Sequence, residues 1–128
     1  MDTETRAVAA SRSQLAVARR WAGETLERFG RAELADDVRL VVTELLTNAI
    51  SHATAPGWAM TVWVRLSSSE RGVRVEVIDP FPERAPEVQR TTRGSGLQIV
   101  ERVAASWGYE LTADAKTVWA VVEPPTPR

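Results

Sequence analysis

Two polar side chains, one turn apart on a predicted helix, have the types and spacing of a metal and phosphate site. In the stretch VTELLTNAISHA at 42–53, Glu44 and Asn48 share one face, because residues four apart lie above one another on a helix. An amide oxygen can complete the octahedral shell of a Mg²⁺ held by phosphates. A glutamate one turn earlier can orient or deprotonate an attacking hydroxyl or water. Taken alone, the pattern favours the plainer interpretation, an ordinary solvated helix face.

Two further spots could complete such a site. Asp79 ends a valine-rich strand, where a carboxylate can accept a hydrogen bond from an exocyclic amine such as that of adenine, or simply terminate the strand. Gly94-Ser95-Gly96 precedes a predicted helix and has the form of an anion site, because glycines let backbone N–H groups approach a phosphate. Arg93 can add a positive charge there. Ordinary helix capping and a solvated arginine remain open explanations of this segment.

The elements that must position these residues follow from hydrophobic periodicity. Helical spacing predicts a first helix from Ser11 or Ser13 to Phe29, ended by Gly30. It predicts two more helices, at about 33–53 and at 97 to about 107, the last ended by Gly108. Period-two alternation predicts two hairpins, with strands at 58–66 and 73–78 and then at 109–112 and 117–122.

These elements define one domain that spans residues 1–128. Residues 1–10 are expected to form a polar, flexible lead-in, and residues 123–128 a flexible, proline-rich tail. The order is α-α-β-β-loop-α-β-β. It predicts an α+β fold, a two-layer sandwich whose mixed, mostly antiparallel sheet is covered by helices.

Composition excludes several classes of protein. The chain has 128 residues, 44% of them hydrophobic, and a net charge of −1 without a basic stripe, which argues against nucleic-acid binding. It has no cysteine and a single histidine, which argues against disulfides and a zinc site. No segment reads as a signal peptide or a membrane span, so we expect a cytoplasmic protein that does not bind membranes.

The motifs, taken in order, resemble the GHKL ATPases, the superfamily of gyrase, heat-shock protein 90, histidine kinases and MutL. VTELLTNAISHA resembles the N-box, and VEVIDP resembles the strand that leads to the adenine-binding aspartate. GSGLQIVERVAASWG resembles the second glycine box, and KTVWAVVE the last strand. The resemblance covers about residues 33–122. Within the superfamily the chain looks most like the small anti-sigma-factor serine/threonine kinases of actinobacterial type.

The resemblance implies a Bergerat α/β sandwich that binds ATP and Mg²⁺. Asn48 would ligate the magnesium ion, and Glu44 would be the general base. Asp79 would bind the adenine amine, with Thr117 nearby. The remaining nucleotide contacts would come from the second glycine box, at Arg93, Gly94, Ser95, Gly96 and Leu97. The partners implied are a sigma factor and an anti-sigma-factor antagonist whose serine or threonine accepts phosphate, and a homodimer is possible.

One departure from the family keeps a second interpretation open. The family's first glycine box, Asp-x-Gly-x-Gly, reads Asp79-Pro80-Phe81-Pro82-Glu83 here, so both glycines are replaced and the prolines remove N–H donors. The alternative is a non-catalytic Bergerat-fold module that binds a protein partner and has weakened or lost ATP binding. A third interpretation is an ATPase subdomain that acts through dimer closure, although no transducing domain is evident in the sequence.

Overall fold

A five-stranded antiparallel sheet forms one layer of the molecule. The computed structural model describes residues 2–51, 61–80 and 96–125. The strands lie in the order β1-β2-β3-β5-β4, and every neighbouring pair is antiparallel. Their bounds are β1 Thr3–Ala9, β2 Thr61–Ser68, β3 Val73–Asp79, β4 Ser106–Leu111 and β5 Lys116–Val122. The predicted hairpins β2-β3 and β4-β5 are confirmed.

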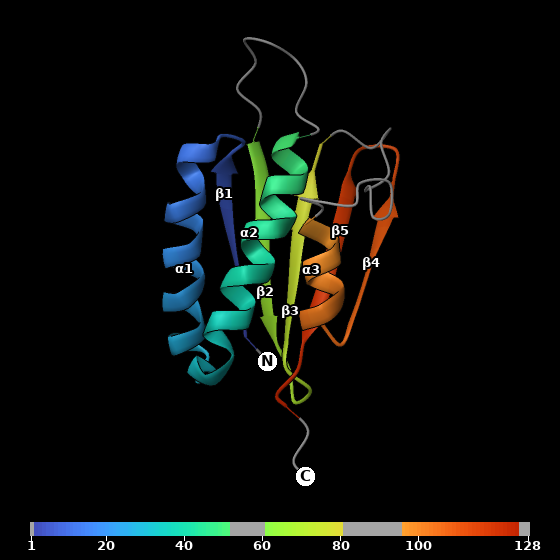
Figure 1. Cartoon of the computed structure of the whole chain (residues 1–128). Coiled ribbons are helices and arrows are strands. Elements are labelled where there is room, and N and C mark those ends of the chain that lie inside the picture. The colour runs from blue at the N-terminus through green and yellow to red at the C-terminus, as the bar shows by residue number, and fades with distance from the viewer. Residues whose placement is uncertain (1, 52–60, 81–95, 126–128) are drawn as a thin grey trace.

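Three helices cover one face of this sheet (Figure 1), as the predicted α+β sandwich requires. They are α1 Leu15–Arg28, α2 Ala35–Ser51 and α3 Gly96–Val103, with short 3-10 turns at Arg12–Gln14 and Ala32–Leu34. Gly30, with φ of 73°, ends α1 as predicted. The N–H of the next residue, Arg31, donates to the Leu26 carbonyl at 2.8 Å, which closes a Schellman-type cap.

The core lies between the two layers. Alternate residues of the central strands face the helices, because side chains along a strand point to opposite sides. The apolar stripe of α2 packs against them and is buried as its spacing predicted. The fully buried residues of α2 are Val38, Val41, Val42, Leu45 and Leu46, with Ala49 at 2% exposure. No helix within the described residues is long and apolar enough to cross a membrane.

The first residues form a strand, so the prediction of a flexible lead-in is wrong. β1 pairs with β2 along its whole length, from Thr3 opposite Ser67 to Ala9 opposite Thr61. Val8 is buried at 4% exposure, and Glu4 on the same face accepts two hydrogen bonds from Arg28 of α1, at 2.6 and 2.9 Å. These bonds lower the pKa of Glu4. Polar residues dominate this edge strand, so its sequence carries little apolar alternation.

The third helix is shorter than predicted. It ends at Val103, and the residues expected to complete and terminate it, Trp107 and Gly108, belong to β4. Gly108 is needed for space, because a Cβ there would lie 2.8 Å from Cζ2 of Trp119 on β5. The sequence alone predicts Gly108 to be a helix stop, whereas its role in the structure is to make room for the indole ring of Trp119.

The sheet face away from the helices carries a charged network at its centre. Arg65 donates to both carboxylate oxygens of Glu76, at 2.7 and 3.2 Å. Arg74 lies 3.6 Å from the same carboxylate and 4.5 Å from the ring centre of Trp119. Burial alone would raise the pKa of Glu76, but the hydrogen bond and charge of Arg65, helped by Arg74, outweigh it and lower that pKa.

Truncation of Val8 tests whether β1 is part of the core. Val8→Ala should lower the free energy of unfolding by about 2 kcal/mol, since it removes two buried methyl groups and leaves a cavity. Val17→Ala makes the same chemical change at a position with 36% exposure and should change stability by less than about 0.5 kcal/mol. Urea unfolding measures both. Equal effects would show that β1 does not pack as described.

The Glu76 network should make stability depend on pH. The folded pKa lies below the ordinary value of 4.5, so the stabilisation by ionised Glu76 is complete above 4.5 and is lost as the pH falls through the folded pKa. Thermal unfolding should therefore show Glu76→Gln to be less stable than wild type at pH 7, with the difference shrinking below pH 4.5. In an Arg65→Met background the pH-dependent part should shrink. A difference that is constant with pH would contradict the assignment.

Candidate functional site

The polar face of α2 carries the two residues singled out for metal and proton chemistry. Glu44 and Asn48 are each half-buried and lie one turn apart, beside the buried Leu45 and Ala49 that fix the helix on the sheet. Burial raises the pKa of Glu44 above its ordinary value. A carboxylate with a raised pKa is a stronger base near neutral pH. The local environment therefore suits Glu44 to accept a proton.

Asn48 has a polar atom that the described chain leaves without a partner. Its Nδ2 is buried and makes no hydrogen bond within the described residues. A buried amide nitrogen without a partner lowers stability, and such groups commonly bind a ligand, an ion or water. Amide oxygen and nitrogen exchange places by a side-chain flip, so the same position can present the oxygen that a magnesium ion prefers. Asn48 thus fits the ligand expected of it.

The hydroxyls of α2 do not compete for this role. Thr43, Thr47 and Ser51 each donate to the carbonyl one turn earlier on their own helix, at 2.8, 2.7 and 2.8 Å. This back-bonding satisfies a polar side chain inside a helix. The hydroxyl donors of these three residues are therefore already used within the helix.

Asp79 ends β3 on the side of the helices and faces a buried lysine. Asp79 and Lys116 are opposite each other in the β3–β5 register, and each residue is 1% exposed. Lys116 Nζ lies 3.7 Å from Asp79 Oδ2. Sequence reasoning missed Lys116, because a lysine beside the polar turn Ala113-Asp114-Ala115 reads as solvated. The strand alternation of β5, with Val118, Ala120 and Val122 inward, was the available signal.

Thr117 follows Lys116 on β5, and its predicted place near the adenine-binding carboxylate stays a prediction. It lies opposite Ile78 of β3 and Glu110 of β4. Neighbouring residues of a strand point to opposite faces, so Thr117 points to the open side of the sheet while Lys116 points toward the helices. Lys116 is the residue of β5 that lies directly opposite Asp79.

The second glycine box is described only in part. Gly96 is the first residue of α3, and Leu97 behind it is buried at 1% exposure, so the predicted helix start is confirmed. Arg93, Gly94 and Ser95 lie outside the described residues. Figure 1 shows the C-terminal end of α2, the end of β3 and the first turn of α3 toward the same end of the molecule. The elements that carry the described candidate residues therefore bring them toward one end of the molecule.

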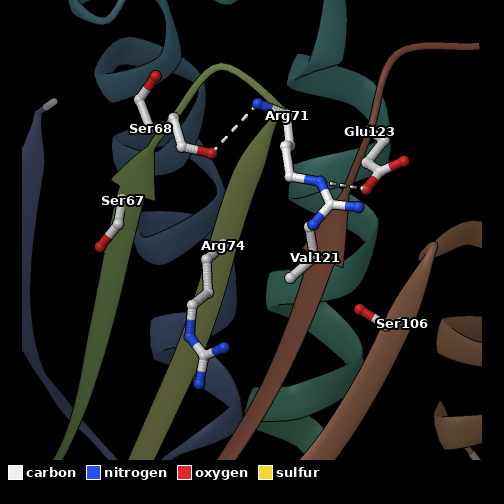
Figure 2. A pocket seen from close by; sticks show the side chains of 8 residues that line it. Ser67, Ser68, Arg71, Arg74, Ser106, Val121 and Glu123 are labelled. Carbon is white, nitrogen blue, oxygen red and sulfur yellow. Dashed lines mark hydrogen bonds and ion pairs between the residues drawn. The ribbon is translucent and has the colours of Figure 1, made fainter.

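A separate hollow lies at the other end of β3. It has a volume of about 250 Å³ on the open side of the sheet (Figure 2). Arg71 of the β2–β3 turn reaches Glu123 across it, at 3.8 Å. Its lining is Ser67, Ser68, Ser69, Arg71, Arg74, Ser106, Val121 and Glu123. Because Arg74 lies near the start of β3 and Asp79 at its end, this hollow is not part of the candidate site.

An antiparallel sheet with helices on one face, an asparagine on the central helix and an aspartate at a strand end define a GHKL-type ATPase domain. A family model, the histidine kinase-like ATPase domain, matches residues 8–122. The chain belongs to this family.

A solved structure has the same fold. It is the crystal structure of the RsbU and RsbW domains of Rv1364c from Mycobacterium tuberculosis, with a TM-score of 0.71 and 18% sequence identity. The likeness covers 98% of this chain and 34% of that one, so the present chain spans about a third of its length. No curated protein matches the chain.

Substitutions at the buried pair should be strongly non-additive. Lys116→Met leaves the Asp79 charge buried without its lysine and should lower the free energy of unfolding by about 3–5 kcal/mol. Adding Asp79→Asn removes that charge. The double variant should therefore lose less free energy of unfolding than the sum of the losses in the two single variants. A double-mutant cycle by urea unfolding measures the coupling. Additive effects would mean that the two side chains do not interact.

Proposed function

We propose that this protein is an ATP-binding regulator, an anti-sigma factor with Mg²⁺-ATP-dependent serine/threonine kinase activity toward an anti-sigma-factor antagonist. Membership of the histidine kinase-like ATPase family supports nucleotide binding. The observation that carries the proposal is on α2, one turn from Glu44, whose pKa burial raises. There, Asn48 has a buried amide nitrogen with no hydrogen-bond partner among the described residues. The likeness to a structure that contains an RsbW domain supports the regulatory class.

The residues divide the work of phosphate transfer between them. Asn48 would hold the magnesium ion, and Asp79 would accept a hydrogen bond from the adenine amine. Bound Mg²⁺-ATP supplies the phosphoryl group, which passes to a serine or threonine oxygen of the antagonist as ADP leaves. Glu44 would take the proton that this hydroxyl loses. Arg93, Gly94, Ser95, Gly96 and Leu97 would lie on the phosphate side.

A second candidate function rests on a different observation. Asp79 is already engaged by Lys116, and Pro80 follows it where the family has a glycine box. A protein-binding module that regulates its partner without nucleotide chemistry would tolerate both features. The two functions differ in what Glu44 does, because a binding module has no use for a base.

Nucleotide titration and a transfer assay separate these functions. Calorimetry should detect Mg²⁺-ATP binding by wild type and a loss of at least tenfold in affinity for Asn48→Ala, which removes a metal ligand. Glu44→Gln should bind within about threefold of wild type but transfer phosphate to candidate antagonists about 10²–10⁴-fold more slowly. Asp37→Asn, which neutralises an exposed carboxylate of the same helix, is the control and should match wild type in both assays.

Two results would contradict the kinase. One is the absence of binding at millimolar Mg²⁺-ATP. The other is a Glu44→Gln variant that regulates transcription in cells as well as wild type does, which would favour the binding module.

A further inference from the structure

Lys116 is a fully buried lysine beside Asp79, in the part of the candidate site that is expected to bind the nucleobase. The stability of the fold alone does not explain why a lysine is buried there. Lysine is almost never fully buried unless it is paired. A buried ion pair gains little over apolar residues of the same size, because removing both charges from water costs several kcal/mol per ion. Lys116 begins β5 and Asp79 ends β3, so the pair lies at strand ends, where the nucleobase is expected, and not in the middle of the sheet.

The two side chains are presented together. Asp79 and Lys116 are direct partners in the β3–β5 register, so they project from the same face of the sheet, and their charged atoms are 3.7 Å apart. At this spacing a planar molecule can form hydrogen bonds with both groups along one of its edges. Both side chains are buried away from water. In such a buried environment, hydrogen bonds to charged groups are stronger than at the protein surface.

The pair has a fixed hydrogen-bonding character. An ionised carboxylate only accepts hydrogen bonds, with room for several, and an ammonium only donates, with three N–H groups. A hydroxyl in the place of Lys116 could do either, but the hydroxyl of Thr117 lies on the other face of the sheet. Asp79 and Lys116 therefore form an acceptor beside an obligate donor.

Adenine carries the complement of this pair on adjacent atoms. Its exocyclic amine at position 6 donates, and its ring nitrogen at position 1 accepts. Guanine has the reverse order, with an oxygen at position 6 and an N–H at position 1. In one and the same pose, adenine would therefore form a hydrogen bond with each of the two side chains. Guanine would instead place an acceptor against Asp79 and a donor against Lys116.

We propose that Lys116 is a second base-reading residue, which donates a hydrogen bond to adenine N1 while Asp79 accepts one from the adjacent amine. This rests on the proposed nucleotide binding and assigns a specificity-determining role that the N-box and the glycine boxes do not contain. Without nucleotide, the two charges neutralise each other, so the empty site holds no isolated buried charge.

The test uses nucleotides that differ at single atoms, and its first part needs no variant. Wild type should bind Mg²⁺-1-deaza-ATP, which keeps the amine but has C–H at position 1, at least tenfold more weakly than Mg²⁺-ATP. This loss is typical of a hydrogen bond to a charged group. It should bind Mg²⁺-GTP at least a hundredfold more weakly than Mg²⁺-ATP. Calorimetry or competition with a fluorescent ATP analogue measures each affinity.

Variants then assign the loss to Lys116. Lys116→Met, checked for folding by circular dichroism, should bind ATP and 1-deaza-ATP with equal affinity, because it has no donor at this position. Lys116→Arg keeps a donor and should retain a preference for ATP. Thr5→Val changes an exposed residue of β1, which β2 and β3 separate from β5, so it is the control and should discriminate as wild type does.

Three results would overturn the proposal while leaving nucleotide binding in place. They are equal wild-type affinities for ATP and 1-deaza-ATP, a wild-type preference for GTP, and tighter ATP binding by Lys116→Met, which would show that the lysine obstructs the base. Failure of wild type to bind any of the three nucleotides would overturn the proposed function itself.

Discussion

The antiparallel register between β3 and β5 is the constraint on which the rest of the structure depends. Successive residues of a strand point to opposite faces, so a register that sets Asp79 opposite Lys116 also sets Ile78 opposite Thr117. The first pair faces the helices and the second faces the open side. A shift of one residue would exchange the faces, expose the buried valines and remove the carboxylate from the candidate site.

The sequence predicts structure well where burial requires apolar residues at regular spacing. The apolar stripe of α2 is buried as its 3.6-residue spacing predicts, and this places Glu44 and Asn48 on the other side of the helix. The two hairpins were also predictable, because their strands alternate apolar and polar residues between turns. In β1, by contrast, only Val8 is buried, so pairing with β2 leaves almost no pattern in the sequence.

The remaining features depend on contacts between distant residues, which no local pattern reports. Gly108 reads as a helix stop until the Trp119 ring of the next strand is placed against it. Lys116 reads as a solvated turn residue until Asp79 is brought opposite, 37 positions earlier in the chain. Motif order predicts Thr117 near the site, but motif order does not determine which side of a strand a residue faces.

The open face of the sheet obeys the same rule as the candidate site. Glu76 is a largely buried carboxylate, and two arginines neutralise it, as Lys116 neutralises Asp79 on the other face. A buried charge without a partner would cost several kcal/mol, so each face of β3 is stable only with its cations in place. β3 therefore carries one compensated carboxylate on each side, and both depend on residues of neighbouring strands.

Different elements hold the two parts of the candidate site, the part expected to bind the metal and phosphates and the part expected to bind adenine. This difference bears on the choice between a kinase and a binding module. Glu44 and Asn48 are fixed by α2, whereas Asp79 and Lys116 are fixed by strand register. The departure from the family, the proline that follows Asp79, concerns the part of the site that is expected to bind adenine. On α2, a buried amide nitrogen without a partner among the described residues and a carboxylate with a raised pKa each lower stability, and a bound ligand could compensate for both. A purely structural α2 would gain stability by lacking them, and this favours a ligand-binding role for the polar face of α2.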